Sequence, residues 1–163
     1  MATIDVLRRA GIEVRSVSLT ASRQVAGSHG VAVHADEMFD PAALSDARMA
    51  IIPGGTVRFN EHEGLRAWLK EYAAEGGLIA AICAAPMVLG GLGLLKGHRA
   101  TCYPGFEKYL DGAILATSEA VVVDGNITTG RGPGLALEFA LQLVRILAGD
   151  QTAHEVAKGL LLE

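Results

Sequence analysis

The chain has 163 residues, of which 50% are hydrophobic, and it carries a formal net charge of −4. This length and composition predict a single globular domain over residues 1–163 with a large apolar core, and they exclude a disordered chain. A small acidic excess and an aromatic content of 5% give no basis for binding nucleic acid.

The first part of the chain alternates between helix and strand patterns. Residues 3–10 are typical of a short helix that Gly11 ends, and residues 12–19 are typical of a strand. Residues 49–52 form a second apolar strand, and residues 61–74 form an amphipathic helix. The core-facing side of that helix is expected to consist of Leu65, Trp68, Leu69 and Tyr72.

The second part continues this alternation. Residues 78–82 are typical of a short buried strand, and residues 84–92 of a helix. Later elements are expected at 99–102 (strand), 119–128 (hairpin around Asp124-Gly125), 133–148 (helix ended by Gly149) and from Asp150 onward (short helix). Strands that alternate with helices predict an α/β fold in which helices cover both faces of a mostly parallel sheet.

Cys83 lies where a buried strand is expected to turn into a helix. Proline is tolerated in a helix only within the first turn, so Pro86 implies that this helix begins at about Ala84. At a helix N-terminus, free N–H groups and the positive end of the dipole favour a thiolate over a thiol. A reactive nucleophile and a small buried structural cysteine are the two readings of this junction.

The strand at 49–52 ends in Pro53-Gly54-Gly55, and paired glycines let the backbone approach a ligand closely. Taken alone, this pattern favours a simple tight turn. Because neighbouring parallel strands end at the same edge of a sheet, the two glycines are expected to lie near Cys83. Gly54 and Gly55 would then supply one N–H donor, and Ala84 another, to an oxyanion on the carbon that Cys83 attacks.

Other candidate residues carry weaker signals. The glycine-rich segment at 129–139 lacks dinucleotide spacing and a phosphate-loop lysine, so no cofactor is expected, although Arg131 is a candidate anion ligand. His29, in a GSHG turn, is either a solvated loop residue or a group that reaches the site. No two histidines have ligand spacing on one helix face, which predicts no metal site. Cys102 is expected to be packed at a strand end, with a second thiol near Cys83 as the alternative.

The sequence also bears on location. No stretch reaches the about 18 apolar residues of a membrane span. The N-terminal MATIDVLRRAG has charges where a signal peptide needs its apolar segment. Two cysteines without metal spacing are too few for a disulfide scaffold, so a reducing cytoplasm is expected.

Five stretches together resemble the ThiJ/PfpI superfamily, and within it the DJ-one branch, that of the human parkinsonism-associated protein and its bacterial relatives. The matching stretches are IDVLRRAGIEV, IIPGG, LIAAICAAP, ATCYPGFEKYL and VVVDGNITTGRGPGLALEFAL. They run from about residue 4 to the C-terminus. The resemblance implies a flavodoxin-like three-layer α/β sandwich, a homodimer, and Cys83 as an oxidation-prone nucleophile.

The chain also departs from this family pattern. Relatives begin with a strand and a loop whose glutamate hydrogen-bonds the reactive sulfur, whereas this chain begins with a helical pattern. We therefore expect the N-terminal strand and its glutamate to be missing, leaving open sheet edges that lower stability and promote association. Proteolytic relatives have a histidine at the position of Ala84, and many deglycase-like relatives have one at Tyr103. The absence of both bases argues against acyl-transfer proteolysis.

Three functions remain open from the sequence. The first is an enzyme of the deglycase or glyoxalase type, in which Cys83 attacks a small aldehyde such as methylglyoxal or its early adduct on an amine. The second is a non-enzymatic redox sensor or stress chaperone of oxidative stress, read out through oxidation of Cys83. The third is an inactive truncated family member.

Overall fold

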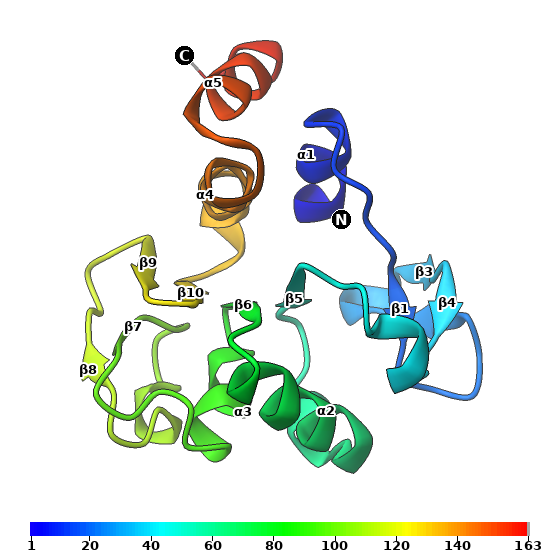
Figure 1. Ribbon diagram of the computed structural model, residues 1–163, viewed down its shortest axis with the longest axis vertical. Coiled ribbons are helices and arrows are strands. Elements are labelled where there is room, and N and C mark those ends of the chain that lie inside the picture. Colours follow the sequence, from blue (N-terminus) through cyan, green and yellow to red (C-terminus); the bar gives the residue numbers. More distant parts are fainter. Residues whose placement is uncertain (163) are drawn as a thin grey trace.

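The computed structural model describes residues 1–162, which form a mixed α/β fold with a four-stranded central sheet (Figure 1). In spatial order the sheet contains β5 (Met49–Ile52), β6 (Leu78–Ile82), β10 (Ile127–Gly130) and β9 (Val121–Asp124). β5, β6 and β10 are parallel, and β9 is antiparallel to β10. The predicted α/β class with a mostly parallel sheet is confirmed.

Helices cover both faces of this sheet, as Figure 1 shows. One face packs against α1 (Ala2–Arg9), α4 (Ala136–Ala148) and α5 (Asp150–Gly159). The other face packs against α2 (Glu63–Ala74) and α3 (Pro86–Gly91). The three layers are those of the predicted sandwich. None of the helices within residues 1–162 has the length and apolar character needed to cross a membrane.

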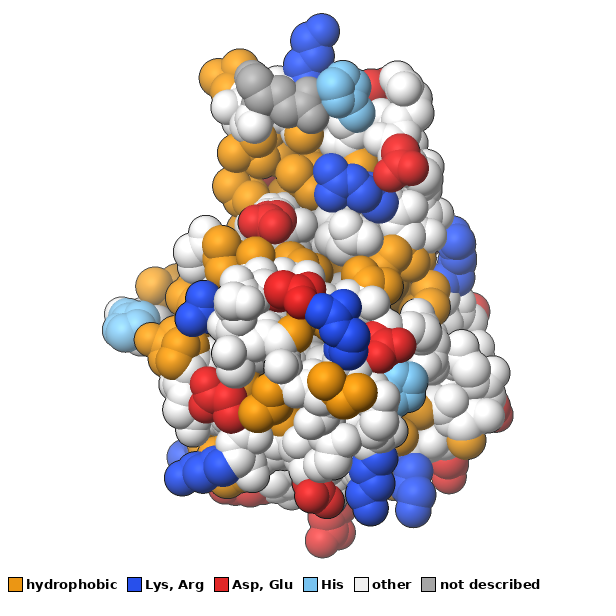
Figure 2. Space-filling model, turned by 90° about the vertical axis from the view of Figure 1, so that its left-hand side faces the viewer, with side chains coloured by type: hydrophobic (Ala, Val, Ile, Leu, Met, Phe, Trp, Pro, Cys, Tyr) orange, Lys and Arg blue, Asp and Glu red, His pale blue; other side chains and the backbone are white. Residues whose placement is uncertain are grey.

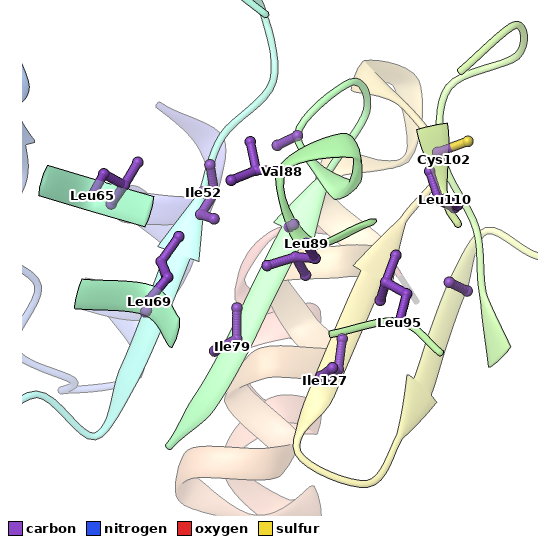
Figure 3. Close-up of a cluster of buried hydrophobic side chains, with 14 residues drawn as sticks. Ile52, Leu65, Leu69, Ile79, Val88, Leu89, Leu95, Cys102, Leu110 and Ile127 are labelled. Atoms are coloured by element: carbon purple, nitrogen blue, oxygen red, sulfur yellow. The ribbon is translucent and has the colours of Figure 1, made fainter. Parts of the chain in front are cut away.

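Strand β6 is continuously apolar because its side chains enter two different cores. Ile79 belongs to the core on the α2–α3 side, and Ala80 to the core on the α4 side, as the twofold alternation of a strand requires. Figure 3 shows Ile79 beside Leu69 of α2 and Leu89 of α3, all three fully buried. Each of these side chains contributes about 1.5–3 kcal/mol by leaving water. Truncating Leu89 to Ala would cost about 2–5 kcal/mol.

Short strand pairs flank the central sheet. They are β1 (Val17–Ser18) with β4 (Glu37–Met38), β2 (Gln24–Ala26) with β3 (Ala32–His34), and β7 (Arg99–Ala100) with β8 (Ile114–Leu115). The β2–β3 hairpin was not expected from the sequence. Its turn is a single 3-10 turn over Ser28–Gly30, and this turn becomes important at the candidate site.

The prediction of one strand over residues 12–19 is wrong. Only Val17 and Ser18 form a strand, and they pair with β4 rather than with the central sheet. A strand needs a neighbouring ladder, and residues 12–15 have no backbone hydrogen bonds to another strand in the described chain. Within residues 1–162, β1 and β5 form no ladder with each other, so β5 has one unpaired edge.

Several predicted boundaries shift by local chemistry. α2 begins at Glu63 because His62 is its N-cap, with Nδ1 accepting the Leu65 N–H at 2.9 Å. The β9–β10 turn is Gly125-Asn126, one residue later than predicted, with Gly125 at φ 59°. Pro133 opens a 3-10 turn over Pro133–Leu135 before α4 begins, and Gly149 follows the end of α4 as predicted.

Candidate functional site

Cys83 directly follows the last residue of β6 and has a left-handed backbone conformation, with φ 68°. This region is uncommon for residues other than glycine and costs about 1–3 kcal/mol. Two hydrogen bonds hold the residue there. Its N–H donates to the Gly130 carbonyl at 2.9 Å, and its carbonyl accepts from the Tyr103 N–H at 2.8 Å. The backbone thus fixes a partly exposed thiol at the edge of the sheet.

The helix after Cys83 begins later than predicted. Residues 83–85 form a turn, and α3 starts at Pro86 rather than at Ala84. The Ala85 N–H closes this turn on the Ile82 carbonyl at 3.2 Å. Pro86 therefore occupies the first helical position, where its missing N–H costs nothing. Ala84 lies in the turn, immediately after the thiol.

The glycine loop after β5 lies directly against Cys83. A Cβ atom added at Gly54 would lie 2.6 Å from Cys83 Cβ and 3.1 Å from Cys83 Sγ, so no side chain fits there. Gly55 has φ 95°, a conformation that side chains rarely adopt. Since β5 and β6 are adjacent and parallel, their loops emerge at the same edge. The structure thus brings Gly54, Gly55 and Cys83 together.

Backbone hydrogen bonds bring the segments that carry Arg131 and Tyr103 next to Cys83. Arg131 follows Gly130, the residue that accepts the Cys83 N–H, and its own N–H donates to the Ala120 carbonyl at 2.9 Å. No carboxylate of residues 1–162 forms an ion pair with its guanidinium. A Cβ at Gly132 would lie 3.4 Å from Tyr103 Cδ2, which places the phenol ring over the loop that carries Arg131.

His29 lies at the tip of the β2–β3 hairpin with φ 58°, and its imidazole forms no hydrogen bond or ion pair within the described chain. Its neighbour Ser28 makes the contact that sequence reasoning missed. The Ser28 hydroxyl donates to the Gly55 carbonyl at 2.8 Å. Ser28 and Gly55 lie far apart in the sequence, so no local pattern predicts their contact. The GSHG turn is the sequence signal that pointed to this region.

Cys102 occupies a different environment. It is 4% exposed and belongs to the core on the α2–α3 side, where Figure 3 places it beside Leu110. Burial raises the pKa of its thiol to about 11, and the negative charges of Glu107 and Cys83 add to this. The prediction of a packed cysteine is confirmed, but β7 covers only Arg99–Ala100 rather than residues 99–102, so Cys102 lies beyond the end of the strand.

Other polar groups have structural roles or form no site. His98 Nδ1 lies 3.6 Å from Asp124 Oδ1. Asp124 belongs to β9, which forms the opposite edge of the central sheet from β5. Among residues 1–162, no three His, Cys, Asp or Glu side chains are grouped so that they could hold a metal ion.

Known proteins are similar to this chain in sequence and in structure. The sequence model described as the DJ-1/PfpI family matches residues 1–146. Protein dj-1beta of Drosophila melanogaster is 40% identical over 162 residues, which cover 97% of this chain and 87% of that protein. The solved structure of oxidized Toxoplasma gondii DJ-1 is 38% identical and superposes with a TM-score of 0.89, covering 98% of this chain and 89% of that one.

A relative with a named activity is also similar. The Caenorhabditis elegans protein called glutathione-independent glyoxalase DJR-1.2 is 32% identical over 163 residues. The match covers 98% of this chain and 87% of that protein.

Proposed function

The chain belongs to the DJ-1/PfpI family, and on that premise we propose that it defends against reactive carbonyls, with Cys83 as the nucleophile that attacks small aldehydes. The observation that carries this proposal is the contact between Cys83 and the glycine loop. A thiol fixed in a left-handed conformation packs directly against the backbone of Gly54, which has no side chain. A backbone loop this close to a thiol suits stabilisation of the oxyanion that forms when the thiol attacks a carbonyl.

The proposed chemistry begins when the Cys83 thiolate adds to the aldehyde carbon of methylglyoxal. The carbonyl electron pair moves to oxygen, and N–H groups of the Gly54–Gly55 loop and of Ala84 stabilise that oxyanion. The proton on the former aldehyde carbon then moves to the neighbouring carbon, which converts the hemithioacetal to a lactoyl thioester. Water hydrolyses the thioester to lactate and releases the thiolate. An early adduct of methylglyoxal with an amine offers the same carbon to attack.

Two further side chains belong to this proposal. Arg131 follows Gly130, which accepts the Cys83 N–H, and we propose that its guanidinium binds the second carbonyl of the substrate or the carboxylate of the product. His29 lies on the hairpin that contacts Gly55 and would line the outer part of the site. Neither side chain acts as the nucleophile, so removing His29 should leave most of the activity.

Lactate formation from methylglyoxal without added thiol tests this function. We expect the unmodified protein and His29→Ala to produce lactate, and Cys83→Ala to produce none while keeping its circular dichroism spectrum. Lactate production by Cys83→Ala would overturn the proposed mechanism. The absence of lactate from the unmodified protein would overturn the enzymatic function.

A redox sensor is the second candidate, and the contrast between the two thiols favours it. Cys83 is partly exposed whereas Cys102 is buried with a raised pKa, so peroxide should select Cys83. Two equivalents of peroxide would convert the Cys83 thiolate to a sulfinate and release two water molecules. The sensor role predicts that the protein makes no lactate and that mass spectrometry detects a sulfinate at Cys83 after peroxide treatment. A chain that shows neither reaction is an inactive family member.

We also propose that the chain forms a homodimer and works in the cytoplasm. The β2–β3 hairpin is a two-stranded unit with few buried residues, and such units need a covering partner for stability. β5 has an unpaired edge, and Leu137 and Leu162 are exposed. Figure 2 shows hydrophobic side chains at the surface among acidic and basic ones. Light scattering after size-exclusion chromatography should give twice the chain mass, and a monomer would contradict the dimer.

A further inference from the structure

A single side-chain hydrogen bond connects the β2–β3 hairpin to the glycine loop. The Ser28 hydroxyl donates to the Gly55 carbonyl at 2.8 Å, and the two residues are 27 positions apart in the sequence. The contact is close on both sides, because a Cβ atom added at Gly55 would lie 3.0 Å from Ser28 Oγ. A side chain at residue 55 would therefore crowd the Ser28 hydroxyl, and it would also be strained at φ 95°.

The glycine loop needs such an anchor. Two consecutive glycines have more backbone freedom than any other pair of residues. Pro53 and Gly55 are exposed at the end of β5, so little packing restrains them. Nevertheless, Gly54 packs so closely against Cys83 that a Cβ atom added to it would lie 2.6 Å from Cys83 Cβ. Donors of an oxyanion site stabilise charge well only when their positions are fixed before the reaction.

The turn that carries Ser28 is closed by a backbone hydrogen bond. The Gly27 N–H donates to the Val31 carbonyl at 2.7 Å, and a Cβ atom at Gly27 would lie only 2.6 Å from that oxygen. His29 holds a left-handed conformation in the middle of the turn. Ser28 is thus presented to the glycine loop by a hydrogen-bonded turn.

We propose that Ser28 is a positioning residue, which holds the Gly54–Gly55 loop against Cys83 and so keeps its N–H groups directed at the carbonyl oxygen of the bound aldehyde. Ser28 does not touch the reacting atoms; it acts through Gly55. This inference rests on the proposed function for its catalytic consequence, but the anchoring of the loop can be measured without any turnover.

The experiment compares Ser28→Ala with two matched variants. Ser28→Thr keeps the hydroxyl and should restore the anchor. Ser22→Ala removes a hydroxyl at the base of the same hairpin, where Ser22 Oγ accepts the Gln24 N–H at 3.1 Å and does not contact the glycine loop. Three quantities are measured in each protein: amide hydrogen exchange in residues 53–57, kcat and KM for methylglyoxal, and the rate of alkylation of Cys83 by iodoacetamide.

Losing one neutral hydrogen bond should change equilibria roughly three- to tenfold. In Ser28→Ala, exchange in residues 53–57 should therefore rise by about that factor, and kcat should fall similarly. KM should stay within about twofold, because the oxyanion develops only in the transition state. Alkylation of Cys83 should not change, since displacement of iodide forms no oxyanion. Ser28→Thr should restore both exchange and kcat, and Ser22→Ala should alter neither.

Several results would overturn the role of Ser28. Unchanged exchange in Ser28→Ala would show that the hydroxyl does not anchor the loop. Failure of Ser28→Thr to restore exchange, or an equal effect of Ser22→Ala, would assign the change to general loosening of the hairpin. A fall in kcat accompanied by an equal fall in alkylation would mean that the thiol itself is disturbed. If the unmodified protein makes no lactate, the proposed function fails, and the exchange measurement alone decides whether Ser28 anchors the loop.

Discussion

The two cysteines differ in environment although one backbone hydrogen bond connects their segments. The N–H of Tyr103, the residue after Cys102, donates to the carbonyl of Cys83. Cys102 is nevertheless packed into the core on the α2–α3 side, whereas Cys83 packs against the core on the α4 side and remains partly exposed. The two thiols therefore differ in their chemistry although their segments are hydrogen-bonded, because their side chains pack against different layers.

The surroundings of the two thiols explain their expected roles. Cys102 is enclosed by apolar side chains and lies near the carboxylate of Glu107, and both favour the neutral thiol. Cys83 instead remains partly exposed and packs against the backbone of Gly54. The four predictions that follow test this contrast, from the largest expected effect to the smallest.

Alkylation should separate the two thiols by the largest factor. With a pKa of about 11, only about one Cys102 side chain in ten thousand is a thiolate at pH 7, and its burial blocks access as well. Iodoacetamide at neutral pH should therefore modify Cys83 at least about a hundredfold faster than Cys102, as read by peptide mass spectrometry. In urea the two rates should converge. Equal rates in the folded protein would remove the contrast.

Adding a side chain at the close contact between residue 54 and Cys83 should reduce turnover strongly. In Gly54→Ala the new methyl group would lie 2.6 Å from Cys83 Cβ, so either the loop or the thiol must move. A displacement of this size in an active site costs about a hundredfold in rate. The matched control is Gly134→Ala, where nothing lies within 4 Å of the added atom and φ is not positive. The control should keep its rate of lactate formation. A loss of equal size in both variants would contradict the steric argument.

The alkaline limit of stability should depend on Cys102. Its pKa rises on folding from 9.0 to about 11, so the folded state favours the neutral thiol. The resulting stabilisation is complete below about pH 9 and is lost as the pH rises through about 11, with a size of about 1–3 kcal/mol. Urea unfolding of the wild type should therefore weaken more between about pH 8 and pH 10.5 than that of Cys102→Ala. Parallel curves for the two proteins would show that Cys102 does not titrate differently in the folded state.

Much of this contrast could be predicted from the sequence, because it depends on local rules and on parallel topology. The apolar run at Leu78–Ile82 followed by Pro86 located the strand and the turn at Cys83. The glycines after Met49–Ile52 were expected beside it, since adjacent parallel strands end at one edge. α3 starts two residues later than the sequence predicts, because hydrogen bonds to Gly130 and Tyr103 hold Cys83 in a turn.

The parts that the sequence could not predict depend on contacts between distant segments. Residues 12–19 have the composition of a strand, but only Val17 and Ser18 find a ladder partner, in Glu37 and Met38. The two strands of the β2–β3 hairpin have only three residues each, which is too short for a clear alternating pattern. The hydrogen bond from Ser28 to Gly55 joins an exposed turn to an exposed loop, and neither segment alone signals the other.

The smallest expected effect is that of Cys102→Ala on catalysis. Because Cys102 belongs to the core on the opposite side of the sheet from the Cys83 thiol, truncating it should leave kcat and KM for methylglyoxal within about twofold of the wild type. The lost sulfur leaves a small cavity next to Leu110, which should lower the free energy of unfolding at neutral pH by about 1 kcal/mol. Cys83→Ala should show the reverse pattern, with no turnover and little change in stability, because its side chain is partly exposed. Chemical denaturation and initial rates measured on both variants decide the matter. A large loss of turnover in Cys102→Ala would mean that the two sites are coupled, through the backbone hydrogen bond between Tyr103 and Cys83.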